Sequence, residues 1–288
     1  MANKINGFDG ANAPVVIFFG QSAGGKTTAL VRLIRFLNKK FRPEVSESFH
    51  NYYYGHTNVA FDGIVKEVEG QLNAPSYGDI MGTKERSLVN IISQNQNESD
   101  YQCRFLEVPG EDFIDLHAAG HIGVGGVASK LDYLSDAENC AYKKIWVFFF
   151  DVDFTSNPEL MASKNDYVNA MKNISIGFND KIIILLNKVD KVEIGDAKKN
   201  LSPSEYENFI NDNFDNVLKE KPFSTKRWSI FGLRDPYKRN FELLGYSSFH
   251  LKKTHKFGTN PTLEIEESGD EYPRKLWETI NRAIQNRY

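Results

Sequence analysis

The sequence predicts an α/β fold in three layers, with a mainly parallel central sheet, one antiparallel edge strand and helices on both faces. Short runs rich in β-branched and aromatic residues recur along the chain, as VVIFF, CRFLEV, KIWVFFFDV and KIIILLNKV. These runs are apolar on both faces, which is typical of strands covered by helices on both sides. Segments between them have apolar residues at helical spacing.

Length and composition favour one elaborated domain. The chain has 288 residues, of which 41% are hydrophobic and 13% aromatic, and this is enough to bury a large core. We expect a single domain over residues 1 to 288. Insertions are expected at about 38 to 80 and 112 to 140, and a C-terminal helix at about 273 to 287.

Charge and targeting signals exclude several classes of function. The net charge of −3 at pH 7 gives no electrostatic case for binding nucleic acid or an anionic membrane. The two cysteines lack metal-ligand spacing, so reduced thiols are expected. The N-terminus lacks an apolar signal core, and no run approaches the roughly 18 apolar residues of a membrane span. We therefore expect a cytoplasmic protein with no transmembrane segment and no nucleic-acid partner.

The first apolar run leads into a glycine-rich turn and then a helix predicted over residues 26 to 40. The turn matches the phosphate-binding pattern G-x-x-x-x-G-K-[ST] with Gly20, Gly25, Lys26 and Thr27. Glycine permits the positive φ and close backbone approach with which successive N–H groups curl around a phosphate. The N-terminus of the helix adds partial positive charge. The sequence therefore predicts a binding site for a nucleoside triphosphate.

Individual roles in this loop follow from the chemistry of its side chains. Lys26 is expected to reach the outer phosphates as a partly solvated side chain, and the Thr27 hydroxyl is expected to ligate Mg²⁺. The residues assigned to the phosphate loop are Gly20, Gln21, Ser22, Ala23, Gly24, Gly25, Lys26, Thr27 and Thr28.

The next elements are a hairpin and two longer helices. A hairpin with its turn around residues 95 to 100 is predicted in the segment SLVNIISQNQNESDYQCRFLEV. An antiparallel edge strand is therefore expected before the strand at 103 to 108. Helices are predicted at 158 to 177 and 203 to 220 from their apolar spacing.

The base of the nucleotide is indicated by Asn187, Lys188, Val189 and Asp190, which follow the apolar run KIIILL. An aspartate at a strand's carboxyl end can accept hydrogen bonds from N1–H and the 2-amino group of guanine, which adenine cannot supply. Asn187 is expected to brace the phosphate loop and to bond the purine edge, with the Lys188 stem across the base. A strand-end turn without a ligand can share this sequence, but a phosphate loop in the same chain makes that interpretation weaker. GTP or GDP is therefore the expected ligand.

These motifs resemble those of the Ras-like GTPases, within the translation-factor-related class of P-loop GTPases. GQSAGGKT matches the family's phosphate loop, NKVD its guanine motif, and EVPGE its second switch, which ordinarily reads Asp-x-x-Gly. The resemblance implies a three-layer P-loop NTPase fold, elaborated here by insertions. It also implies slow, Mg²⁺-dependent GTP hydrolysis that controls binding of a protein effector or activator.

The resemblance implies further site residues outside the two specific motifs. Thr83 precedes the expected edge strand, where the family's first switch places a threonine on Mg²⁺ and the γ-phosphate. Thr57, in the same long insertion, is an alternative. Gly110 lies in the second switch, and Ser247 with Ser248 follows the last core strand, where backbone N–H groups would meet the guanine oxygen.

Two acidic residues depart from the family's pattern. Glu107 occupies the position of the family's aspartate, so a longer carboxylate is expected to help Thr27 and Thr83 organise Mg²⁺. Glu111 stands where many members carry a glutamine that orients the attacking water, and a carboxylate there either acts as a base or faces away. Catalytic roles are therefore assigned to Lys26, Thr83 and Glu111, with slow hydrolysis expected and no arginine finger assigned.

Two alternative functions remain open at this point. In P-loop ATPases with an added central strand, the acid that organises Mg²⁺ ends an apolar strand, and KIWVFFFDVD supplies Asp151 in that form. A nucleotide-bound scaffold that never hydrolyses its ligand is suggested by Glu107 and Glu111. Comparing the affinities for GTP and ATP distinguishes the ATPase from the GTP-binding switch. Following bound GTP over hours distinguishes the non-hydrolysing scaffold from the switch.

Overall fold

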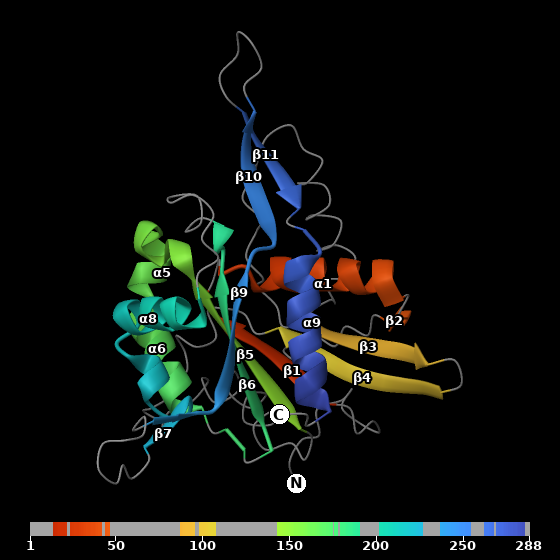
Figure 1. Ribbon diagram of the computed structural model, residues 1–288, viewed down its shortest axis with the longest axis horizontal. Helices are drawn as coiled ribbons and strands as arrows, with labels where there is room; N and C mark the ends of the chain where they lie inside the picture. Colours follow the sequence, from red (N-terminus) through yellow and green to blue (C-terminus); the bar gives the residue numbers. More distant parts are fainter. Residues whose placement is uncertain are drawn as a thin grey trace, which may run out of the picture.

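The computed structural model describes most of the sheet and its helices. The described residues are 14–21, 24–41, 44–46, 87–95, 98–107, 143–174, 176–177, 179–190, 202–226, 237–254, 262–267 and 269–285. Their central element is a seven-stranded sheet with the order β2-β3-β4-β1-β5-β6-β9 (Figure 1).

Most strands of this sheet run parallel. β1 pairs in parallel with β4 and β5, β5 with β6, and β6 with β9, whereas β3 is antiparallel to both β2 and β4. The predicted α/β fold with a mainly parallel sheet is therefore confirmed. The strands are β1 (Val15–Gly20), β2 (Glu44–Ser46), β3 (Ser87–Asn95), β4 (Glu98–Glu107), β5 (Lys144–Asp151), β6 (Lys181–Asn187) and β9 (Phe241–Tyr246).

The antiparallel strand was expected at the edge of the sheet, and its position differs from that expectation. The hairpin between β3 and β4 turns after Asn95, within the predicted region. However, β2 pairs with the other side of β3, so β2 forms the edge. A strand of three residues, Glu44–Ser46, is too short to show a period in the sequence.

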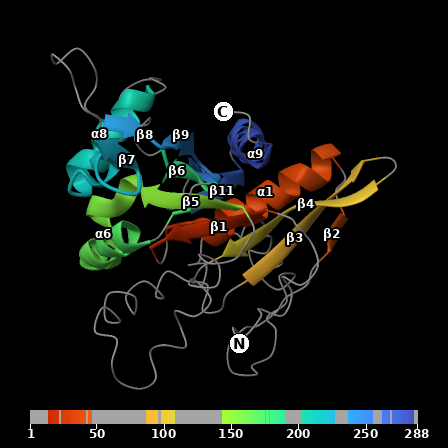
Figure 2. The same cartoon turned by 90° about the horizontal axis from the view of Figure 1, so that it is seen from below.

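Helices cover both faces of the sheet. Figure 2 shows α1 and α9 on one side, with α6 and α8 on the other. The helical segments are α1 (Lys26–Phe41), η1 (Val152–Ser156), α5 (Pro158–Ala162), α6 (Lys164–Asn173), α8 (Pro203–Asn213), η2 (Val217–Lys219) and α9 (Glu271–Ile284).

The strand β1 shows how one apolar run serves two core layers. Ile17 and Phe19 pack in the cluster that includes residues of α6 and α8, whereas Val16 and Phe18 pack in the cluster of α1 and α9. All four side chains are fully buried. Successive side chains of a strand point to opposite faces of the sheet, so alternate residues of β1 stabilise opposite core layers. Burying a side chain of this size contributes about 1.5–3 kcal/mol.

The predicted helix at 158 to 177 is two helices, α5 and α6, separated at Ser163. Gln21 Nε2 donates to Leu160 O at 2.6 Å and to Ser163 Oγ at 2.8 Å, so a side chain from a distant loop binds where the helix is interrupted. The helix predicted at 203 to 220 ends at Asn213, because the following turn needs left-handed backbone, for example at Asn216 with φ 55°.

Two small antiparallel sheets accompany the main one. β10 (Phe249–Thr254) pairs with β11 (Thr262–Glu267), and β7 (Ser224–Lys226) pairs with β8 (Tyr237–Arg239). The β10–β11 hairpin follows β9 and projects from the body of the molecule (Figure 1). The predicted insertions lie mainly outside the described residues. Of the helices described, none has the length and apolar character needed to cross a membrane.

Candidate functional site

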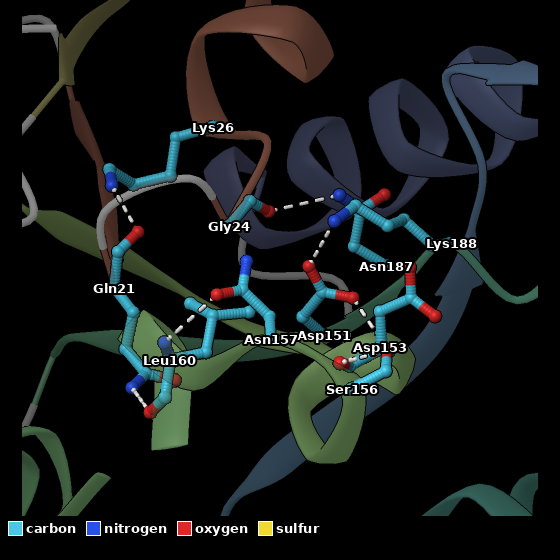
Figure 3. Close-up of polar contacts among 10 residues, drawn as sticks. All are labelled: Gln21, Gly24, Lys26, Asp151, Asp153, Ser156, Asn157, Leu160, Asn187 and Lys188. Carbon is cyan, nitrogen blue, oxygen red and sulfur yellow. Dashed lines mark hydrogen bonds and ion pairs between the residues drawn. The ribbon is translucent and has the colours of Figure 1, made fainter. Parts of the chain in front are cut away.

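The predicted motifs gather at one edge of the sheet. Because β1, β5, β6 and β9 are parallel, their carboxyl ends meet there. The glycine-rich loop follows β1, Asp151 ends β5, the NKVD segment follows β6, and two serines follow β9. Figure 3 shows the Asn187 side chain pointing toward the Gly24 carbonyl of the loop, and the side chains of Lys188 and Asp151 pointing toward each other.

The glycine-rich loop is shaped by close approach to neighbouring strands. A Cβ on Gly20 would lie 2.7 Å from Phe149 Cβ in β5, closer than real Cβ contacts allow. Gly25 has φ +81°, and a Cβ there would lie 2.3 Å from Asn187 Nδ2. Glycine is therefore required at both ends of the pattern, once for strand packing and once for the turn into α1.

Lys26 lies inside the loop rather than partly in solvent. Its Nζ donates to Gly20 O at 2.8 Å and to Gln21 O at 2.9 Å, and the residue is only 5% exposed. The expectation of a partly solvated side chain is wrong, because the loop carbonyls fold around the ammonium group. The arrangement holds a positive charge at the loop.

Gln21 connects the loop to α5 and α6 through its side chain. The bonds to Leu160 O and Ser163 Oγ leave the residue 3% exposed. Sequence reasoning assigned Gln21 only through its backbone and missed this contact. The partners lie more than a hundred residues away in the chain, and no pattern in the sequence marks them.

Asn187 joins the end of β6 to the glycine-rich loop. Its Nδ2 donates to Gly24 O at 2.9 Å, and the residue is 2% exposed. Asn187 was expected to brace the phosphate loop, and this hydrogen bond to the loop carbonyl is the contact that such a role requires. A buried amide hydrogen bond of this kind fixes the distance between the two segments.

Asp190 meets the segment that follows β9. Ser247 Oγ donates to Asp190 Oδ1 at 2.5 Å, and Val189 N donates to Tyr246 O at 3.2 Å. Asp190, Ser247 and Ser248 are all buried, at 7%, 1% and 7% exposure. The structure therefore brings together two segments that the sequence assigned separately to the same ligand.

Lys188 pairs with Asp151 across two neighbouring strand ends. Its Nζ lies 2.5 Å from Asp151 Oδ2, and Asp151 Oδ1 accepts from Asp153 N at 2.8 Å (Figure 3). Sequence reasoning missed this ion pair. The strand register sets Asp151 opposite Asn187, next to Lys188. The ion pair can therefore be predicted only when the pairing of β5 with β6 is known.

Two predicted metal ligands have described backbones. Thr27 lies in the first turn of α1, and Glu107 ends β4, where the register sets Phe18 of β1 opposite it. Glu107 thus ends a strand that flanks β1 on the side away from β5. The phosphate-loop residue Thr28 also lies in the first turn of α1. The predicted site residues that lie outside the described ones are Ser22, Ala23, Thr57, Thr83, Gly110 and Glu111.

Two tyrosines lie beneath the site. Tyr167 OH donates to Phe149 O at 2.8 Å and to Phe19 O at 3.3 Å, so it joins α6 to β5 and β1. Burial raises the pKa of Tyr167 well above its ordinary value, and it also raises that of Tyr246, although a hydrogen bond with Ser248 opposes the latter shift. Both hydroxyls therefore stay protonated and act as donors.

Comparisons with known proteins give distant structural matches. No protein-family model matches the sequence, and no curated protein matches it significantly. The mammalian SRP receptor matches at 15% identity with a TM-score of 0.37, covering 81% of this chain and 90% of that one. The GTPase-like domain of S. cerevisiae Ski7, bound to GTP, matches at 16% identity with a TM-score of 0.41, covering 95% of this chain but 51% of that one.

A third match is a nucleolar GTP-binding protein from Plasmodium falciparum. It is 12% identical with a TM-score of 0.40, and the match covers 97% of this chain and 90% of that one. Two of these three proteins are named for binding GTP or for a GTPase-like domain. Identity and TM-score are low in all three, so the function proposed below rests on the geometry of this chain.

Proposed function

We propose that the chain binds a guanine nucleotide with Mg²⁺, hydrolyses GTP slowly and acts as a nucleotide-controlled switch for a protein partner. The hydrogen bond from Asn187 Nδ2 to Gly24 O carries this proposal. It joins a loop suited to phosphate to the strand end that bears Asp190. A nucleotide has its phosphates and its base at opposite ends, and this edge of the sheet offers a group for each.

The phosphate end is formed by the loop and the start of α1. Backbone N–H groups of the loop, the helix N-terminus and the Lys26 ammonium all favour an anion. Thr27, Thr83 and Glu107 are proposed to hold Mg²⁺, because hydroxyl and carboxylate oxygens are the ligands this ion prefers. The ion would neutralise phosphate charge when bound. Glu111 is proposed to act near the γ-phosphate.

The base end is formed by Asp190 with the two serines after β9. An ionised carboxylate is an acceptor with about four lone-pair sites, and Oδ1 of Asp190 accepts from Ser247. Such a carboxylate suits the donors N1–H and the 2-amino group of guanine. Asn187 is proposed to bond the purine edge, and the backbone N–H groups of Ser247 and Ser248 to meet the guanine oxygen.

The layout argues against the ATPase alternative. An added central strand would separate β1 from the strand that carries the acid, yet β1 pairs directly with both β4 and β5. Asp151 is 2% exposed, pairs with Lys188 and caps η1 through Oδ1. Its carboxylate therefore already serves two protein groups.

The base assignment is tested with Asp190→Asn. Asparagine keeps an oxygen for the Ser247 hydrogen bond but replaces one acceptor by a donor, which suits xanthine, whose position 2 carries a carbonyl. Each buried group left unpaired costs about 1–3 kcal/mol, so we expect at least about a tenfold loss of GTP affinity and tighter binding of xanthosine triphosphate. Isothermal titration of wild type and variant with GTP, ATP and xanthosine triphosphate measures this. Unchanged GTP binding in the variant, or equal affinity of wild type for ATP, would contradict the guanine site.

Turnover is tested on the wild-type protein. Purified protein is loaded with GTP and Mg²⁺, and the bound nucleotide is followed over hours. We expect GDP to appear slowly. Asp151→Asn is expected to leave this rate nearly unchanged. GTP that stays intact throughout would favour the non-hydrolysing scaffold.

A further inference from the structure

We propose that Asp151 is a positioning residue for base recognition, because its ion pair holds Lys188 so that the aliphatic stem of this lysine is fixed against the face of a bound base. Asp151 belongs to neither the glycine-rich loop nor the NKVD segment. The inference rests on the proposed function, since it concerns how the same site recognises guanine.

The first observation is the burial of the carboxylate. The Asp151 side chain is 2% exposed at the end of β5, whereas the Lys188 side chain is 30% exposed. A buried charge is costly unless it is paired and hydrogen-bonded. Asp151 meets this need with the Lys188 ammonium at 2.5 Å and the Asp153 N–H at 2.8 Å.

The second observation is the backbone at Lys188. Its φ is 60°, a left-handed conformation that is uncommon for a residue with a side chain. The sharp turn at this point lies between Asn187, bound to the phosphate loop, and Asp190, bound to Ser247. Lys188 is therefore held on both sides by its neighbours, and the ion pair with Asp151 fixes the remaining freedom, which is that of its long side chain.

A fixed lysine stem changes what a base encounters on binding. A free lysine side chain has many rotamers, and a base that packs on it must order them. Ordering one such side chain weakens binding by about twofold to tenfold. The ion pair orders the stem before the ligand arrives, and it also directs the ammonium toward β5 rather than toward the phosphates.

The test uses Asp151→Asn. Asparagine keeps an oxygen for the Asp153 N–H, so it removes the charge while retaining the turn. Competition against a fluorescent GDP analogue measures affinity for GDP and for Mg²⁺-pyrophosphate, which lacks the base. We expect GDP to bind about twofold to tenfold more weakly and pyrophosphate to bind as in wild type. At saturating GTP, the rate of hydrolysis should stay unchanged.

A double-variant cycle shows whether Asp151 acts through Lys188. Lys188→Met removes the ammonium and keeps an unbranched stem, so adding Asp151→Asn to it should weaken GDP binding no further. Asp153→Asn is the matched control for a change of charge in this turn, because it keeps the backbone N–H that donates to Asp151, and it should bind GDP as wild type does. Thermal unfolding checks each fold, and if Asp151→Asn does not fold, Lys188→Met alone carries the GDP and pyrophosphate comparison.

The outcomes separate this inference from the proposed function. If wild type binds GDP but Asp151→Asn binds it equally well, or loses GDP and pyrophosphate affinity together, the positioning role is wrong and the guanine site stands. An additive loss in the double variant also contradicts the role. If wild type binds no guanine nucleotide, the proposed function itself is wrong, and the inference is wrong with it.

Discussion

At the scale of single residues, the contact between Gly25 and Asn187 decides whether the loop and β6 can meet. The Asn187 amide reaches Gly24 O only because nothing projects from Gly25, whose φ is +81°. Neither residue could be replaced by a larger one without moving a strand end. This explains why a glycine of the loop also matters for the strand end that bears Asn187.

Gly25→Ala is expected to damage both the loop and the contact with β6. The new Cβ would lie 2.3 Å from Asn187 Nδ2, and alanine disfavours this φ. We expect the free energy of unfolding to fall by about 1–3 kcal/mol, measured by urea denaturation, together with weaker GTP binding. Gly269→Ala is the control, since nothing lies within 4 Å of a Cβ there, and it should change stability by less than about 0.5 kcal/mol. Equal effects of the two changes would contradict the contact.

Lys26→Ala is expected to affect stability as well as binding. The ammonium donates to Gly20 O and Gln21 O, so its removal leaves two loop carbonyls without these donors. We expect GTP binding to be lost in titrations and the free energy of unfolding to fall by about 1–3 kcal/mol. A variant that binds GTP as wild type does would exclude the phosphate assignment.

At the scale of elements, Tyr167 ties α6 to the two central strands below the site. Its hydroxyl contacts carbonyls of both β1 and β5, and the ring packs in the cluster that those strands share with α8. Tyr167 thus ties both strand ends, those that carry the glycine-rich loop and Asp151, to α6.

Tyr167→Phe removes this tie and keeps the ring. The loss of one buried donor should lower the free energy of unfolding by about 0.5–1.5 kcal/mol in urea denaturation. Packing of the ring against Phe19 and Phe150 is retained, so the variant should still fold. Unchanged stability would mean that the hydroxyl contributes nothing net to the contact between α6 and the sheet.

Local signals predicted those elements whose residues lie close together in the chain. The strands β1, β5 and β6 are short, apolar on both faces and bounded by polar residues, and all were expected near their observed bounds. The glycine-rich turn and the NKVD segment are also local patterns, so their positions at strand ends could be predicted.

Contacts between distant segments could not be predicted in this way. The bond from Gln21 to Leu160 and the ion pair of Lys188 with Asp151 depend on the order of strands and on side-chain directions. Gln21 also binds Ser163, the residue at which the predicted helix is interrupted. Burial of Lys26 likewise follows from how the loop closes, which composition does not reveal.

At the scale of the whole molecule, buried acidic groups link both core layers to pH. Cys103 and Tyr246 lie in the cluster under α1 and α9, and Tyr167 lies in the opposite one. Burial raises the pKa of each group above its ordinary value of 9.0 for the cysteine and 10.0 for the tyrosines. The folded protein therefore keeps protons that the unfolded chain releases in alkali.

Stability should consequently fall as the pH rises above about 9. A raised pKa in the folded state contributes stability that is complete below the unfolded pKa and is lost as the pH rises above it. Each group contributes a slope of about 1.4 kcal/mol per pH unit, beginning with Cys103 and followed by the tyrosines. Urea denaturation at pH 7 and in steps above about pH 9 measures the slope, and Cys103→Ala should reduce its first part. A slope unaffected by this change would contradict the role of the buried thiol.

The hydrogen bond between Ser247 and Asp190 also has a consequence for synthesis on the ribosome. The glycine-rich loop is translated early, whereas β9 and Ser247 are translated near the end of the chain. At about 5–20 residues per second, the two are separated by on the order of ten to forty seconds. Throughout that interval the serine that pairs with Asp190 does not yet exist. Under the proposed function, the pairing of Asp190 that contributes to base recognition would therefore be completed only late in translation, after the glycine-rich loop has been made.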